Sequence, residues 1–169
     1  NTPLIYFSTK RENVLVYLSN AIEKHCKETG FTHDGKWHKW ASYGFESDGT
    51  LRIDEYYPNA IEDTYKGVSG YIYYADTACE TEDNINIDNV VITSKPVSVS
   101  GFEFVEDAYS EILKALEAGL IKIRRYEDMS DKMLSWVENT IKNEYKKKKN
   151  EPDYRCFLEA KFSFLNIDL

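Results

Sequence analysis

Hydrophobic residues recur at helical spacing near the start of this chain. Apolar side chains three and four positions apart predict a helix over about residues 10–28. Thr9 and Glu12 match the capping box that opens a helix, and Gly30 is a typical C-terminal stop.

The same spacing predicts two further helices towards the C-terminus. A second capping-box match, at residues 100–103, predicts a helix that ends at Gly119. A third helix is expected from Ser130 to the lysine run 146–149, where cations complement the helix dipole.

The period changes to two in the remaining segments, which indicates β-strands. Asp48 and Gly49 supply turn chemistry between two alternating runs and predict a β-hairpin. Residues 59–66 fit either one helical turn or a loop. The strands expected from alternation and β-branched content are residues 3–8, 37–45, 51–57, 68–75, 90–99, 120–126 and 154–165.

Clustered strands with helices at both ends favour an α+β fold over a doubly wound parallel sheet. We expect a mostly antiparallel central sheet of about five to seven strands and about three helices. At 169 residues, with no interdomain linker or repeat, the chain is predicted to be a single domain, 1–169.

Composition argues against a disordered protein and against one that spans a membrane. Hydrophobic residues at 42% argue against disorder, and no apolar run has the roughly 20 residues of a membrane span. No signal-peptide pattern is visible at the start of the sequence. Cys26, Cys79 and Cys156 are odd in number and far apart, which favours a reducing compartment. We therefore expect a cytoplasmic protein of bacterial type, with no membrane contact.

The net charge is concentrated in one stretch. Residues 46–88 hold eleven carboxylates and two basic residues, a net charge of −9, whereas the whole chain carries −8. An acidic protein is a poor ligand for nucleic-acid phosphates, so direct nucleic-acid binding is not expected.

The acidic stretch is also rich in tyrosine. Tyrosine offers a large rigid contact area with a polar tip, and carboxylates around it steer a basic partner. The competing interpretation is a half-buried sheet, because Tyr and Trp are good strand residues. The residues expected to contact a partner are Glu46, Asp48, Asp54, Glu55, Tyr56, Tyr57, Glu62, Asp63, Tyr71, Tyr73 and Asp76.

No pattern indicates a metal site, a cofactor or a catalytic nucleophile. His25 and Cys26 are adjacent on the predicted helix and point about 100° apart, so they do not face one ion easily. His33 and His38 lack the paired spacing of zinc sites. Phosphate-binding loops and nucleophile elbows are absent from the sequence. We expect no metal, no cofactor and no enzyme activity.

Two other chemistries stay open. A glycosidase-like hydrolase would need two carboxylates across a cleft, and Glu55 with Asp76 is one such combination. A weaker basic face, Lys122, Arg124 and Arg125 with the lysine run, could touch phosphates, although a solvated surface explains it better.

The function expected from these observations is stoichiometric binding without catalysis. Size, charge and the lack of a catalytic motif are similar to those of immunity proteins. We expect a small acidic immunity or inhibitor protein that covers the active site of a basic partner, such as a toxin nuclease. The alternatives are the small hydrolase and an acidic mimic of nucleic acid. The oligomeric state is not indicated.

Overall fold

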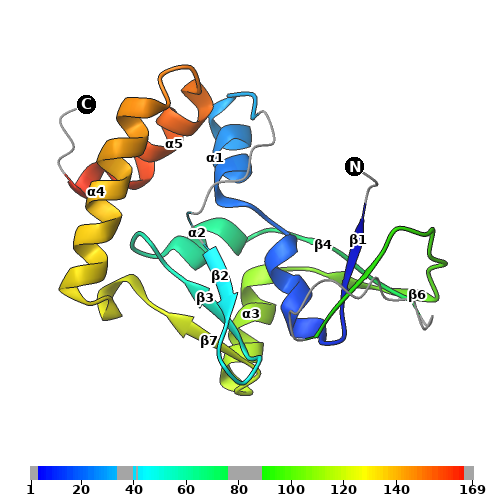
Figure 1. Ribbon diagram of the computed structural model, residues 1–169. Helices are drawn as coiled ribbons and strands as arrows, with labels where there is room; N and C mark the ends of the chain where they lie inside the picture. The colour runs from blue at the N-terminus through cyan, green and yellow to red at the C-terminus, as the bar shows by residue number, and fades with distance from the viewer. Residues whose placement is uncertain (1–3, 34–39, 41, 76–88, 166–169) are drawn as a thin grey trace. The chain divides into compact units, whose positions relative to one another are not determined.

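The computed structural model describes residues 4–33, 40, 42–75 and 89–165 (Figure 1). It confirms the α+β class, with five α-helices and seven strands in these ranges. The strands form three small sheets, in place of the one central sheet expected from the sequence.

The elements follow one another in a mixed order. The α-helices are α1 (Ala21–Thr29), α2 (Ala60–Tyr65), α3 (Ala108–Glu117), α4 (Asp131–Lys147) and α5 (Pro152–Lys161). The strands are β1 (Ile5–Ser8), β2 (Ser42–Phe45), β3 (Leu51–Asp54), β4 (Gly70–Tyr74), β5 (Val90–Thr93), β6 (Gly101–Val105) and β7 (Ile121–Arg124). Three short 3₁₀ helices complete the described elements: η1 (Arg11–Tyr17), η2 (Tyr126–Asp128) and η3 (Ser163–Leu165).

Strand pairing joins segments that are distant in sequence. β1 pairs antiparallel with β5, and β4 pairs antiparallel with β6. The third sheet has the order β2-β3-β7. The turn between β2 and β3 is closed by the Glu46 amide donating to the Thr50 carbonyl at 2.9 Å, with Gly49 at a φ of 76°. This confirms the turn at Asp48-Gly49.

The chain divides into two compact units. Unit 1 comprises Asn1–Leu18, Phe45–Arg52 and Tyr65–Lys122; unit 2 comprises Ser19–Gly44, Ile53–Thr64 and Ile123–Leu169. The single domain expected over residues 1–169 stays a prediction.

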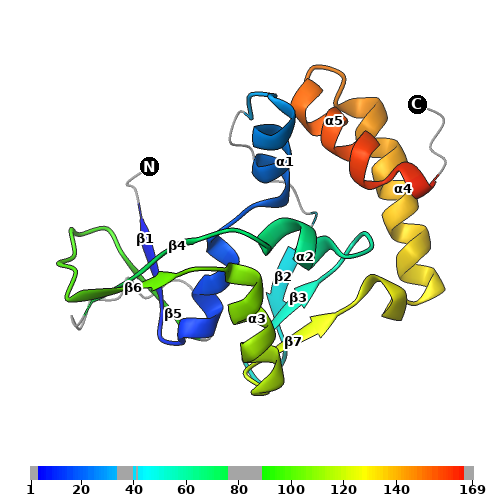
Figure 2. The ribbon, with the colours of Figure 1, turned by 180° about the vertical axis from the view of Figure 1, so that it is seen from behind.

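Unit 2 has an aromatic core between its helices. Figures 1 and 2 both show α1 and α4 lying against α5. The Trp40 ring meets Phe162 edge-on with centroids 5.3 Å apart, and its indole N–H donates to the Tyr154 hydroxyl at 2.5 Å. Val137 and Ile141 of α4 are buried in the same cluster. The predicted third helix is therefore confirmed as α4, with the Ser130 hydroxyl accepting from the Met133 amide.

The N-terminal helix expected over residues 10–28 is interrupted. The segment forms η1 and then α1, and Thr9 bonds Asn89 instead of capping a helix. The Asn20 side chain caps α1 by accepting from two amides of its first turn. Asn20 itself has an extended backbone, as an N-cap residue does, so it lies outside the helix and separates α1 from η1. Gly30 ends α1 in the left-handed conformation, as expected.

The helix predicted to follow residues 100–103 begins later than expected. Residues 101–105 form β6, and Asp107 is the N-cap of α3, accepting from the Ser110 amide at 2.7 Å. The capping-box match was wrong because Phe102 and Phe104 alternate with Glu103 and Val105 at the strand period.

The long strand predicted over residues 154–165 is wrong. The segment forms α5, with Pro152 at the first helical position, where its missing N–H costs nothing. The buried residues Tyr154, Phe157 and Leu158 follow helical spacing, and the apparent alternation came from residues on other faces.

Candidate binding surface

The antiparallel pair β4–β6 carries aromatic residues on one face. Tyr71 lies opposite Phe104, and Tyr73 lies opposite Phe102. Because side chains alternate along a strand, these four residues share a face. We call Tyr71, Tyr73, Phe102 and Phe104 the aromatic face.

The aromatic face is open to solvent. Its side chains are 51%, 62%, 66% and 51% exposed, in the order of their numbers. Their rings contact one another: the Tyr71 centroid lies 5.0 Å from that of Phe104 and 5.6 Å from that of Phe102. Four large apolar rings in one exposed cluster are unusual on a protein that has no partner.

The other face of the pair is packed against the protein and is held by ion pairs. Ile72 and Val105 are buried. Arg11 of η1 donates from Nε to the Glu103 carboxylate at 2.9 and 3.0 Å and also pairs with Glu111 of α3 at 2.7 Å. Hydrogen bonds from Arg11 and from the Tyr74 hydroxyl lower the pKa of Glu103 to about 2. The pair is thus held on one side and presents its rings on the other.

Most predicted acidic contact residues already have basic partners. Glu46 accepts from Arg52 at 2.5 Å, and Lys122 Nζ lies 3.9 Å from it. Asp54 is buried, with its Oδ1 3.0 Å from Arg124 Nε, an ion-pair contact without hydrogen-bond geometry. Arg124, and Arg125 beside Glu55, therefore act as internal counter-ions, although both belong to the basic face considered for phosphate binding.

Glu55 is the most deeply held of these carboxylates. It is 1% exposed and accepts from the Ile61 amide at 3.0 Å and from Arg125 at 3.2 Å. A carboxylate held in this way ties α2 to the strand before it and is shielded from a substrate or partner.

The remaining predicted residues divide between core and surface. Tyr56 and Tyr57 are buried, and the Tyr57 hydroxyl donates to Asp63 at 2.9 Å. Asp63 also pairs with Lys161 at 2.8 Å, and Glu62 is half-buried. Burial and the nearby Asp63 raise the pKa of Tyr57 well above its ordinary value. Asp54, Glu55, Tyr56 and Tyr57 are thus unable to reach a partner's surface without local unfolding.

The last two predicted contact residues are Asp48 and Asp76. Asp48 is exposed and accepts from the Thr50 amide at 2.9 Å, a hydrogen bond that lowers its pKa. Asp76 falls outside the described residues.

The sequence prediction included Tyr71 and Tyr73 and missed Phe102 and Phe104. The signal that could have found them is the alternation over residues 101–105, which the capping-box match concealed.

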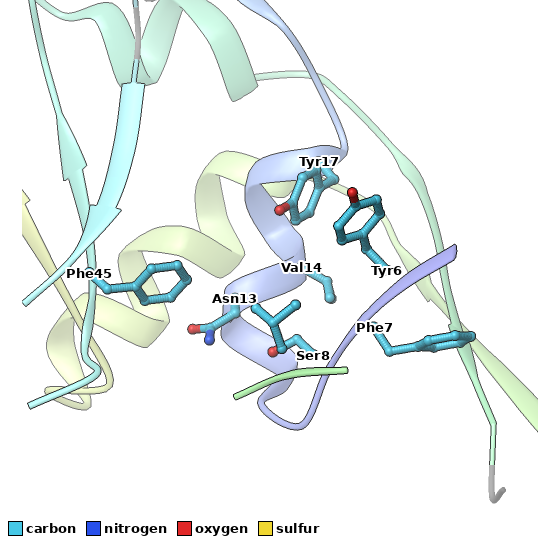
Figure 3. Close-up of a pocket in the computed structure, with 8 residues that line it drawn as sticks. Tyr6, Phe7, Ser8, Asn13, Val14, Tyr17 and Phe45 are labelled. Carbon is cyan, nitrogen blue, oxygen red and sulfur yellow. The ribbon is translucent and has the colours of Figure 1, made fainter. Parts of the chain in front are cut away.

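A cavity of about 390 Å³ also lies in unit 1, beside β1 and η1 (Figure 3). Tyr6, Tyr17 and Phe45 supply ring surface to its lining. Asn13 lies at its wall and is 4% exposed, and neither polar atom of its amide has a hydrogen-bond partner in the described part of the chain. A buried amide without hydrogen-bond partners costs free energy, so Asn13 is an unfavourable polar position in this wall.

Comparison with protein-family models, with curated proteins and with solved structures finds no match to this chain. Among the helices in the described ranges, none is both long and apolar enough to cross a bilayer.

Proposed function

We propose that this chain is a non-enzymatic binding protein of the immunity or inhibitor type, which contacts a basic protein partner through the aromatic face. The observation that carries the proposal is the cluster of four exposed, mutually contacting rings on β4–β6. Aromatic side chains dominate the energetic centres of protein interfaces because they bury much area at low entropy cost.

Charge supports the choice of a basic partner. The chain carries a net charge of −8, which raises the encounter rate with a positive surface and disfavours nucleic acid. Because Glu46, Asp54, Glu55 and Asp63 are paired internally, they add little direct contact. The net charge then speeds the encounter with the basic partner, and the rings of the aromatic face supply the affinity.

An odd number of cysteines, with Cys26 and Cys156 as free thiols, supports a reducing compartment such as the cytoplasm. The hydrolase and the nucleic-acid mimic remain predictions, and neither gains an observation from the described residues.

Site-specific photo-crosslinking in the producing cell tests the proposal. A benzophenone amino acid replaces Tyr73 in one variant and Leu120, which is 50% exposed in the same unit, in a control. We expect the Tyr73 variant to capture one basic protein and the Leu120 variant to leave it uncaptured. Equal capture at both positions, or capture of an acidic protein at Tyr73, would refute the proposal.

A further inference from the structure

Three potential metal ligands converge inside unit 2. Cys26 comes from α1, His33 from the segment after α1, and Asp153 from the first turn of α5. One ligand atom from each residue lies within 4.8 Å of the other two. His33 Nδ1 and Asp153 Oδ2 are 2.9 Å apart.

The cluster is enclosed. Cys26 is 1% and Asp153 6% exposed, and the His33 side chain is 10% exposed. The buried Asp153 carboxylate and the His33 imidazole pair with each other, which offsets part of the cost of their burial. Burial, together with the nearby Asp153 and Cys156, raises the pKa of the Cys26 thiol. A protonated, inaccessible thiol is a poor nucleophile, so a cysteine-hydrolase role does not fit.

Neighbouring residues define the limits of the cluster. His25 precedes Cys26 on α1, and its Nε2 lies 3.5 Å from Cys156 Sγ. Adjacent residues on a helix point about 100° apart, so the His25 and Cys26 side chains do not point in the same direction. Cys156 thus contacts His25, whereas Cys26 is grouped with His33 and Asp153.

We propose that Cys26, His33 and Asp153 bind one Zn²⁺ ion, through Sγ, one ring nitrogen and one carboxylate oxygen. Thiolate, imidazole and carboxylate are the ligands that zinc prefers, at bond lengths of about 2.0–2.3 Å. Tetrahedral geometry then places the ligand atoms roughly 3.3–3.8 Å apart. The observed separations, from 2.9 Å between His33 and Asp153 up to the 4.8 Å limit of the cluster, lie on both sides of that spacing.

Charge balance favours zinc at this enclosed position. A thiolate and a carboxylate neutralise the two charges of the ion, and His33 binds as a neutral ring, so the filled site carries no net charge. The Cys26 proton leaves to solvent when the metal binds. Water takes the fourth position, and the ion links α1 to the start of α5.

Residue spacing does not predict this site. Six residues separate Cys26 from His33, and Asp153 is more than a hundred residues away, so the set matches no paired zinc motif.

Metal binding by the full chain tests the proposal directly. Protein stripped with a chelator is titrated with Zn²⁺ against a competing indicator, and zinc content is measured after dialysis. The melting temperature is recorded with and without zinc, and Co²⁺ is used as a spectroscopic probe. The variants are Cys26→Ser, Asp153→Asn and, as the matched thiol control, Cys156→Ser.

We expect one zinc per chain, a higher melting temperature with zinc, and a thiolate-to-cobalt charge-transfer band. Cys26→Ser should lose the band, and Asp153→Asn should weaken zinc binding by about 100-fold or more, because even outer-shell changes cost 10–100-fold. Cys156→Ser should keep both properties. Zinc below one equivalent in the wild type, a band that survives in Cys26→Ser, or loss of zinc in Cys156→Ser would overturn the assignment. A band that persists in Cys156→Ser excludes Cys156 as the sulfur ligand, so this control tests the assignment even where Cys26→Ser folds poorly.

Discussion

Tyr71 and Phe104 lie directly opposite each other in the antiparallel β4–β6 pair, with ring centroids 5.0 Å apart. Each is 51% exposed, so the contact does little to bury apolar surface within the chain. The residues on the other face, Ile72 and Val105, are buried. The two faces of the pair therefore have different roles. The buried face stabilises the strands, and the aromatic face is exposed for contact with a partner.

This separation predicts unequal effects of two adjacent substitutions in β6. Phe104→Ser should lower the free energy of unfolding by no more than about 1 kcal/mol, the usual range of a cross-strand pair. Val105→Ala, one position along and 2% exposed, should cost about 2 kcal/mol through lost burial and a cavity. Urea denaturation measures both values. A larger loss in Phe104→Ser would mean that the aromatic face is part of the core.

The Arg11–Glu103 contact predicts a pH dependence of stability. The pKa of Glu103 is about 2 in the folded chain, below its ordinary value of 4.5, so folding favours the charged form. Its contribution is present in full above pH 4.5 and is lost as the pH falls towards 2. Wild-type unfolding free energy should therefore converge on that of Glu103→Gln over this range. The exposed neighbour Glu106 gives a control, Glu106→Gln, which should keep the wild-type pH dependence in urea denaturation between pH 2 and 7.

Glu55 should be a structural carboxylate. In Glu55→Gln the charge that pairs with Arg125 is lost, although the Ile61 amide keeps an acceptor. The expected cost is about 1–3 kcal/mol, because the partly exposed Arg125 can regain water. The exposed Glu127→Gln variant should be neutral within about 0.5 kcal/mol. Thermal and urea unfolding of both variants give the comparison, and equal stabilities would contradict this role for Glu55.

The buried amide of Asn13 leads us to predict that an apolar substitution at this position is stabilising. Both polar atoms of its buried amide lack partners in the described ranges, so Asn13→Leu replaces an unsatisfied group with an apolar one of similar size. We expect a gain of about 1 kcal/mol in unfolding free energy. Asn13→Asp, which places a charge at the same position, should instead destabilise the chain. A loss of stability in Asn13→Leu would indicate that the amide has a hydrogen-bonded partner in solution.

Local signals in the sequence were enough to predict where several elements begin or end. Ser130 and the lysine run bounded α4 correctly, and Asp48-Gly49 marked the turn between β2 and β3, because caps and turns depend on neighbouring residues. Where two local signals indicated different structures for the same segment, the predicted element was wrong. The capping box near Gly101 concealed β6, and alternation after Tyr154 concealed the helical spacing of α5.

The candidate surface was only partly predictable. Tyr71 and Tyr73 follow from the alternation of β4, but Phe102 and Phe104 join them only through pairing with a strand about thirty residues away. The pairing of Asp54 with Arg124 and of Asp63 with Lys161 also depends on tertiary contacts. In the described part of the acidic stretch, these ion pairs leave fewer carboxylates available to a partner than the composition indicates.

The affinity of the crosslinked partner for a double variant, Tyr73→Ala with Phe102→Ala, tests the binding surface most directly. Calorimetric titration against the wild type should show a loss of at least about 2 kcal/mol, roughly 30-fold, because aromatic residues at interface centres carry that much. The unfolding free energy should change by no more than about 1 kcal/mol per residue, and Leu120→Ala should bind as the wild type does. Unchanged affinity in a folded double variant would contradict the assignment of the aromatic face as the binding surface.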